Sequence, residues 1–263
     1  MRYDIIMPMN FSEDVMSTEN KLYGKTIIWN GDSLCAGKAF DDSKDDDAWA
    51  GRIAKRNLMI YKNYAVGGGT VTENVMFASK QKLRHSVSAT LDTMYSEHPD
   101  ADYVIFEGGS NDADLLGNFI RGDDTSRFGT FDPNDFDGNY DKDTFSGALE
   151  SVFYRATRYW SGKKLAFIVA HKMGAHLPGF TSDINNRRIY FERAIEICQK
   201  WGIPYLDLWS CCYLNPKLEW MYDKSKTPEE NVASGSFYAD GQHLTAKGYD
   251  LTADIIDSWL KTL

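Results

Sequence analysis

Apolar and polar positions alternate along the chain in blocks that predict strands and helices in turn. Five short apolar runs, rich in β-branched residues and closed by glycine or polar residues, predict buried strands. They cover residues 26–29, 59–66, 102–106, 165–170 and 204–208. Apolar residues that recur every three or four positions predict amphipathic helices, at 48–56, 145–160 and 184–200.

Two further segments are predicted to be helical. Thr245 suits the N-cap of a last helix whose Leu251, Ile255 and Trp259 are expected to face the core. Residues 71–96 are predicted to be polar and largely helical. Strands separated by helices in this rhythm indicate an α/β protein, a three-layer α/β/α sandwich around a parallel sheet.

Residues 25–263 are predicted to form one domain, preceded by an N-terminal extension at 1–24. The 263 residues are 43% hydrophobic, enough for a sizeable core. A net charge of −9 argues against a nucleic acid or an anionic membrane as partner, because both attract basic patches. The sequence shows neither a signal-peptide pattern nor a long apolar span, so a cytoplasmic location is expected. The four cysteines form no CxxC motif and are expected to be reduced.

Polar motifs follow the predicted strands at the edge where the loops of a parallel sheet converge. Gly31-Asp32-Ser33-Leu34 follows the first strand and would place a serine at a helix start, although alone it could equally be a helix cap. Glycines 67–69 could turn a backbone N–H toward that serine or, alternatively, hold a phosphate. Asn111 follows the third strand, and its amide can donate to an oxyanion.

The fourth motif, Asp240-Gly241-Gln242-His243, precedes the last helix. A carboxylate three residues before an imidazole can hold the Nδ1 hydrogen and leave Nε2 free to accept a proton from Ser33. The remaining histidines lack such a partner. His85 and His98 are assigned to the surface, and His171 and His176 to a loop at the edge of the site.

Taken together, the four motifs resemble the SGNH hydrolases, the GDSL family of esterases and lipases. The Ser, Gly, Asn and His of the family's name match Ser33, Gly68, Asn111 and His243, and its acid matches Asp240. The choice of Gly68 over Gly67 or Gly69 rests on spacing from Asn63 and stays open. The resemblance runs from about residue 26 to the end and implies a flavodoxin-like, five-stranded parallel sheet. No GxSxG motif supports the α/β-hydrolase alternative.

The resemblance also implies a mechanism. His243 would take the proton of Ser33 as it attacks an ester carbonyl, and Asp240 would orient the imidazole. The oxyanion would be bound by the N–H groups of Ser33 and Gly68 and by the Asn111 side chain. Neither a cofactor nor a metal is expected in this scheme.

Residues 112–143 are predicted to be an acidic insertion, with nine aspartates and three basic residues. A loop of this length is typical of a functional segment, and it is interpreted as a wall or lid of the substrate pocket. Its Asp135-Phe136-Asp137-Gly138 resembles part of a calcium loop, but the ligand positions of an EF-hand fall on Pro133 and Thr144. A calcium site is therefore not predicted.

The favoured function is hydrolysis of a short acyl ester, acetyl above all, on a carbohydrate or similar polar alcohol. The partner is thus a small-molecule ester, an acylated sugar being the favoured case, and the oligomeric state stays open. A lysophospholipase or thioesterase of the same family is the nearest alternative. A non-catalytic, flavodoxin-like binding protein with a phosphate on residues 67–70 is the alternative from another class.

Overall fold

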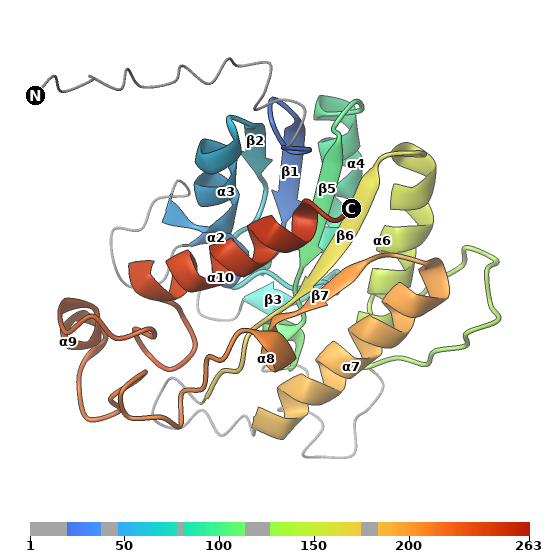
Figure 1. Cartoon of the computed structure of the whole chain (residues 1–263). Coiled ribbons are helices and arrows are strands. Elements are labelled where there is room, and N and C mark those ends of the chain that lie inside the picture. The colour runs from blue at the N-terminus through green and yellow to red at the C-terminus, as the bar shows by residue number, and fades with distance from the viewer. Residues whose placement is uncertain (1–19, 38–46, 78–80, 114–126, 175–183) are drawn as a thin grey trace, which may run out of the picture.

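A computed structural model of the chain describes residues 20–37, 47–77, 81–113, 127–174 and 184–263. Its centre is a parallel sheet of five strands in the order β2-β1-β5-β6-β7 (Figure 1). The strands are β1 (Thr26–Asn30), β2 (Ile60–Asn63), β5 (Tyr103–Glu107), β6 (Lys164–Val169) and β7 (Tyr205–Asp207). This order confirms the α/β fold and the five-stranded parallel sheet.

The central strands are apolar because helices cover both faces of the sheet. All five residues of β5 are buried, and β6 is buried from its second residue. One layer holds α3 (Trp49–Asn57) and α10 (Ala246–Leu260), which pack against each other. The other holds α4 (Val87–Glu97), α6 (Phe145–Tyr159) and α7 (Ile184–Trp201), in which α6 contacts both neighbours.

Shorter elements complete the described chain. They are α2 (Ser33–Ala36), α8 (Leu208–Cys211), α9 (Pro228–Ala233) and the hairpin of β3 (Met76–Phe77) and β4 (Lys82–Leu83). Every connection between consecutive strands of the main sheet crosses over, so the carboxyl ends of all five strands lie at one edge. The loops that carry the polar motifs start at this edge.

The prediction that residues 71–96 are largely helical is wrong for the first half of the segment. Only α4 is helical, and it begins after Ser86, whose hydroxyl accepts the N–H of Ala89. Before it the described residues form bends and the short hairpin of β3 and β4, with an isolated bridge between Thr70 and Ser86. Buried Asp112 accepts the N–H groups of Val71 and Thr72, at 2.9 and 3.0 Å, and thus holds this part out of a helix.

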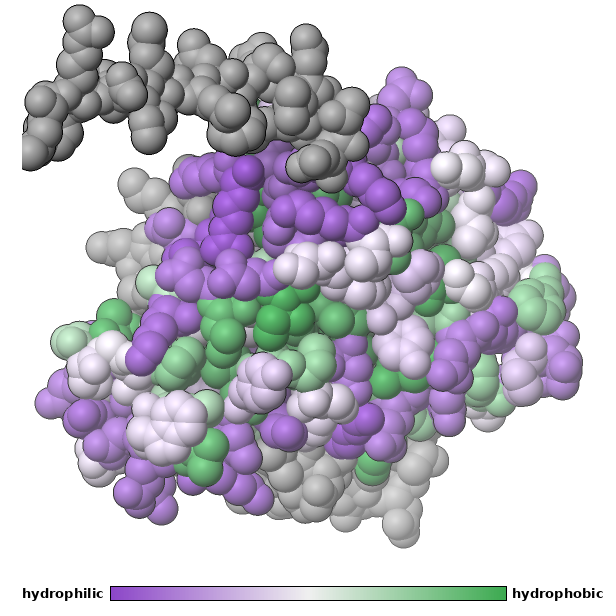
Figure 2. Space-filling view, viewed as in Figure 1, coloured by the Kyte–Doolittle hydropathy of each residue, from purple (hydrophilic) through white to green (hydrophobic). Residues whose placement is uncertain are grey.

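The last helix is where the sequence predicts it, but its buried face is rotated. Leu251, Ile255 and Trp259 are only partly buried, whereas the buried positions include Tyr249, Thr252, Ala253, Ile256 and Leu260. Contact with α3 sets this rotation, since Trp49 Nε1 donates to Thr252 Oγ1 at 2.8 Å. Figure 2 shows a band of hydrophobic surface bordered by hydrophilic residues in the part of the molecule where Figure 1 draws α10.

The described part of the acidic insertion, residues 127–143, lies against α6 and α7. Lys200 of α7 donates to the carbonyl of Asp132, and Arg193 lies over the ring of Phe128, 4.6 Å from its centroid. Residues 114–126 and the predicted extension up to residue 19 lie outside the described residues. Among the helices that the structure describes, none is long and apolar enough to cross a membrane.

Candidate active site

Ser33 is the first residue of α2, directly after the turn that ends β1. Asp32 is the N-cap of this short helix, and its Oδ1 accepts the N–H of Leu34 at 2.9 Å. Gly37 ends the helix with φ at +72°, a left-handed conformation that glycine adopts without strain. The turn thus presents a serine hydroxyl together with the backbone N–H groups of a helix start.

The structure brings His243 and Asp240 to this serine. Ser33 Oγ lies 2.8 Å from His243 Nε2, and His243 Nδ1 lies 2.8 Å from Asp240 Oδ2. The three side chains therefore form a relay of hydrogen bonds from hydroxyl to imidazole to carboxylate. All three are buried or nearly so, with His243 the most exposed at 9%.

Asp240 is held as an anion by its own loop. Its Oδ1 accepts the N–H groups of Gln242 and His243, at 3.0 and 2.7 Å. Burial opposes ionisation, but the hydrogen bond and charge of His243 and these backbone donors lower the pKa of Asp240 below its ordinary value. Gly241 takes φ of +83° between them, which lets the loop fold back on itself.

The glycine loop after β2 lies next to Ser33. A Cβ added to Gly67 would lie 3.9 Å from the Cβ of Ser33. The N–H of Gly69 donates to the carbonyl of Val66 at 2.9 Å, so it is not available to an oxyanion. Gly68 takes φ of +78°, and Arg84 Nη1 donates to its carbonyl at 2.6 Å. This leaves the N–H groups of Gly67 and Gly68 as the candidates in this loop.

Asn111 is tied to both motifs that flank the serine. Its Nδ2 donates to Asp32 Oδ2 at 3.2 Å and to the carbonyl of Gly69 at 2.9 Å. Both acceptors are oxygens, so the side chain must turn its amide nitrogen toward them. The two hydrogens of the amide are thereby both used, and an oxyanion would have to share or replace the longer bond.

His171, assigned to a loop at the edge of the site, is buried behind the catalytic loop instead. Its Nε2 donates to the carbonyl of Gln242 at 2.8 Å. Burial lowers the pKa of His171 to about 4, so the ring is neutral near pH 7. His176, predicted at the same edge, lies outside the described residues.

Arg187 is a residue that the sequence did not single out. It is buried and bridges two loops, donating to the carbonyl of Gly174 and to Gln242 Oε1, each at 3.0 Å. Gly174 in turn donates its N–H to the carbonyl of Gly241 at 2.9 Å. A positive residue in an amphipathic helix gives no signal of this role, because its partners are a backbone carbonyl and a side-chain amide on two other loops.

His85 was assigned to the surface, yet it is only partly exposed and lies behind the glycine loop. Its Nε2 is 2.9 Å from Asn30 Oδ1, and a Cβ on Gly69 would lie 3.1 Å from its ring. Burial lowers its pKa below the ordinary value for histidine. The polar side chain of Asn30 at the end of β1 is the partner that draws it inward.

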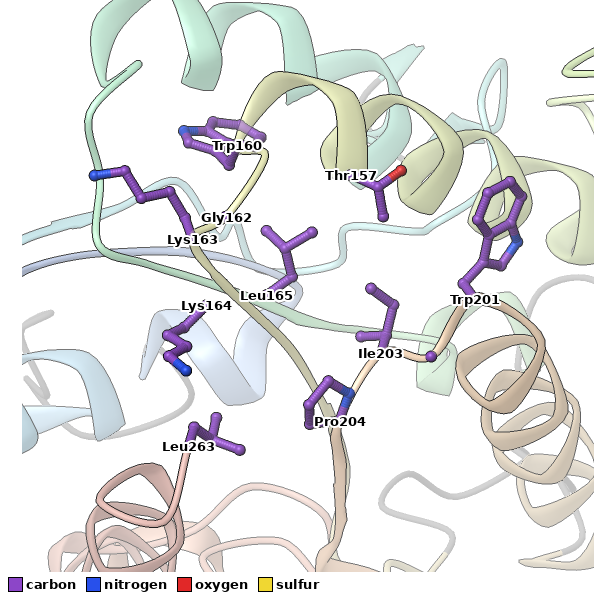
Figure 3. A pocket seen from close by; sticks show the side chains of 11 residues that line it. Thr157, Trp160, Gly162, Lys163, Lys164, Leu165, Trp201, Ile203, Pro204 and Leu263 are labelled. Carbon is purple, nitrogen blue, oxygen red and sulfur yellow. The ribbon is translucent and has the colours of Figure 1, made fainter.

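A separate hollow of about 290 Å³ lies at the opposite end of β6 and β7. Trp160, Leu165, Ile203 and Leu263 line it together with Lys164 (Figure 3). Its lining includes no serine or histidine, so it offers none of the chemistry found around Ser33. In the described parts of the chain no three His, Cys, Asp or Glu side chains are grouped to hold a metal ion.

The fold and this site define a class: an α/β/α hydrolase with a serine, histidine and carboxylate on loops at the carboxyl edge of a parallel sheet. The model of the GDSL-like lipase/acylhydrolase family matches residues 30–251. The chain belongs to this family and is an esterase or acylhydrolase of the GDSL type.

Solved structures share the fold at low identity, while no curated protein matches the chain. A Lactobacillus plantarum protein is 17% identical at a TM-score of 0.67, with 91% of this chain and 98% of that one covered. Est24, a carbohydrate acetylesterase from Sinorhizobium meliloti, is 12% identical at 0.60, with 90% and 99% covered. The inhibitor-bound aryl esterase of M. smegmatis is 13% identical at 0.61, with 91% and 100% covered.

Proposed function

We propose that the chain hydrolyses short acyl esters, acetyl esters of carbohydrates in particular, with Ser33 as nucleophile, His243 as base and Asp240 as the acid that orients it. The observation that carries the assignment is the unbroken pair of 2.8 Å contacts from Ser33 Oγ to His243 Nε2 and from His243 Nδ1 to Asp240 Oδ2. This is the geometry that general-base activation of a serine requires.

In the proposed reaction His243 takes the hydroxyl proton as Ser33 Oγ bonds to the ester carbonyl carbon. The resulting oxyanion is bound by the N–H groups of Ser33 and of Gly68, with Asn111 as the side-chain donor. Collapse of the intermediate expels the alcohol, which receives the proton from His243, and leaves an acyl group on Ser33. Water, deprotonated by His243, then releases the acid and restores the serine.

A polar cavity beside the catalytic loop supports a polar alcohol as the leaving group. It measures about 610 Å³ and is lined by residues of one segment between Pro216 and Ser225. The ring of Tyr222 lines this cavity and also lies against the catalytic loop, 2.8 Å from the position that a Cβ of Gly241 would take. Lys217, Glu219 and Lys224 add charged groups of both signs to the lining, which suits hydroxyl groups better than a hydrocarbon chain.

The name of one structural neighbour agrees with this substrate class. Est24 is described as a carbohydrate acetylesterase, whereas the M. smegmatis neighbour is described as an aryl esterase. At 12% and 13% identity these neighbours support the fold, and the substrate is proposed from the cavity.

The nucleophile is tested by labelling with an organophosphate and mapping the adduct. We expect one adduct per chain, on Ser33, and none in Ser33→Ala, whose kcat should fall by about 10⁴-fold or more. The substrate is tested with nitrophenyl esters of increasing chain length and with acetylated oligosaccharides. Preference for acyl chains of about eight carbons or more would instead support a lipid or thioester substrate.

A further inference from the structure

Glu107, the last residue of β5, lies beneath the turn that carries Ser33. Its side chain is fully buried, and its Oε2 accepts the N–H of Asp32 at 3.0 Å. The same oxygen lies 2.6 Å from the position of a Cβ at Gly31, so a glycine at 31 makes room for this carboxyl. Its other oxygen, Oε1, is buried and accepts no hydrogen bond from a described residue.

Glu107 is one of three buried carboxyl groups under the site, and it has the fewest donors. Asp112 accepts hydrogen bonds from Val71 N, Thr72 N and Thr72 Oγ1. Asp32 accepts hydrogen bonds from Leu34 N, Asn111 Nδ2 and the hydroxyl of Ser110. Glu107 accepts one, from the backbone of Asp32. A buried carboxylate with a single donor is costly, whereas a neutral carboxylic acid is much less so.

The charges around Glu107 also favour its neutral form. Burial, followed by the charge of Asp32 and then that of Asp112, raises the pKa of Glu107 well above its ordinary value. The side chains of Glu107 and Asp32 also interact with each other, which raises the pKa of Glu107 and lowers that of Asp32. Burial raises the pKa of Asp32 as well, but Ser110, Leu34 and His243 favour its charged form.

We propose that Glu107 is a positioning residue that remains a neutral carboxylic acid and donates its proton to the carboxylate of Asp32. Asp32 then stays the anion that caps α2 and holds Asn111, the residue proposed to bind the oxyanion. This inference rests on the proposed function for its effect on rate. It goes beyond that function because it assigns a protonation state and a role to a group that touches no substrate.

Neutrality of Glu107 also matters for the developing charge. An ionised Glu107 would place a second negative charge next to Asp32, under the loops proposed to bind the oxyanion. Such a charge would oppose the tetrahedral intermediate, because a buried site screens it poorly. Protonated Glu107 therefore holds the turn that carries Ser33 in place without adding negative charge beneath the oxyanion.

Two substitutions test whether Glu107 acts as a neutral hydrogen-bond donor. Glu107→Gln keeps an oxygen for the N–H of Asp32 and an amide N–H for its carboxylate, so we expect kcat to stay within about 3-fold of the parent protein. Glu107→Leu removes both contacts, and we expect kcat to fall by about 10- to 100-fold with KM changed much less. Rescue by glutamine but not by leucine would distinguish positioning by a neutral donor from simple filling of space.

Infrared spectroscopy tests the protonation state without any substrate. We expect a protonated-carboxyl C=O band at neutral pH that Glu107→Gln removes. The matched control is Glu150→Gln, since Glu150 is also buried but lies 2.6 Å from Lys200 Nζ, and we expect the band to persist there. A Glu107→Gln variant as slow as Glu107→Leu, or a band unchanged in Glu107→Gln, would overturn the proposal. Failure of organophosphate to label Ser33 would remove the proposed function, while the infrared result would still stand.

Discussion

The imidazole of His171 donates from Nε2 to the main-chain carbonyl of Gln242, 2.8 Å away, and so links the exit of β6 to the loop that carries Asp240 and His243. Because a carbonyl only accepts, the proton must sit on Nε2. Nδ1 of the ring is buried without a partner in the part of the chain that the structure describes. A neutral His171 is therefore built into the support of the catalytic loop.

The buried neutral state of His171 predicts a pH dependence of stability. Its pKa is about 4 in the folded protein against 6.5 for a free histidine. Between these values the unfolded chain binds a proton that the folded chain does not, so stability is lost as pH falls from about 6.5 to 4. The loss attributable to this group amounts to about 3 kcal/mol.

His171→Gln is the variant that checks this dependence. Glutamine keeps an N–H donor near the position of Nε2 but does not titrate. Urea denaturation of both proteins across the acidic range should show the parent losing more stability than the variant, with little difference above pH 7. Parallel curves for the two proteins would show that His171 titrates normally in the folded state.

Asn111→Ala should lower kcat by about 10²- to 10³-fold, the typical effect of losing one oxyanion donor. Stability should fall by only about 1–2 kcal/mol, because Asn111 also donates to Asp32 and Gly69. Steady-state kinetics with a nitrophenyl acetate and urea denaturation measure the two effects. Asn74→Ala, which removes a surface amide bonded to Asp143, serves as control and should leave kcat unchanged. An unchanged kcat in Asn111→Ala would contradict its assignment to the oxyanion.

The fold and the placement of Ser33, Asn111, Asp240 and His243 could be read from the sequence for a physical reason. Strand ends followed by polar motifs are local features, and a parallel sheet brings such ends to one edge whatever the details of packing. The structure joins Ser33, His243 and Asp240 by hydrogen bonds. It holds Asn111 against Asp32 and Gly69, the neighbours of that serine.

The contacts that hold the catalytic loops in place could not be predicted from the sequence. His171 donates to the main chain of Gln242, 71 residues away, and Arg187 donates to the side chain of the same residue, 55 residues away. No local pattern encodes contacts over such distances in the sequence. The rotation of α10 depends on which face meets Trp49, and the bends at 71–72 depend on Asp112. These are tertiary contacts that override the local preference for a helix or for one of its faces.

Gly241→Ala should destabilise the protein through both its backbone and its neighbour. Gly241 has φ of +83°, and an added Cβ would lie 2.8 Å from the ring of Tyr222. Gly235→Ala is a matched control, since Gly235 has φ of +72° but nothing within 4 Å of the added Cβ. We expect about 1 kcal/mol of lost stability in Gly235→Ala from backbone strain alone.

The additional loss of stability in Gly241→Ala measures the clash with Tyr222. We also expect kcat to fall in this variant, because Asp240 and His243 flank the displaced backbone. The double variant Tyr222→Ala, Gly241→Ala should recover the stability lost through the clash with Tyr222. The loss from backbone strain, which Gly235→Ala shares, should remain. Equal losses of stability in Gly241→Ala and Gly235→Ala would mean that the ring of Tyr222 moves aside freely. The proposed contact of Tyr222 with both the polar cavity and the catalytic loop would then lack support.

Lys200→Met should destabilise the protein by about 3–5 kcal/mol without changing the chemistry at Ser33. Its ammonium is almost fully buried, 2.6 Å from Glu150 Oε2 and 2.8 Å from the carbonyl of Asp132. Removing one partner of a buried pair leaves the other charge without compensation. Four aromatic rings surround the ammonium, with centroids 4.9 to 5.7 Å away, those of Phe131, Phe136, Tyr140 and Trp201.

Three of those rings belong to the acidic insertion, so the same variant should loosen residues 127–143 from α7. Limited proteolysis should then cut within this range faster than in the parent protein, while urea denaturation measures the loss of stability. The double variant Lys200→Met, Glu150→Leu should recover much of that loss, because it removes both buried charges. Lys226→Met breaks an exposed pair with Asp223, 3.6 Å long, and should cost far less stability than Lys200→Met. A loss in Lys200→Met as small as in Lys226→Met would show that the insertion is anchored to α7 by other contacts.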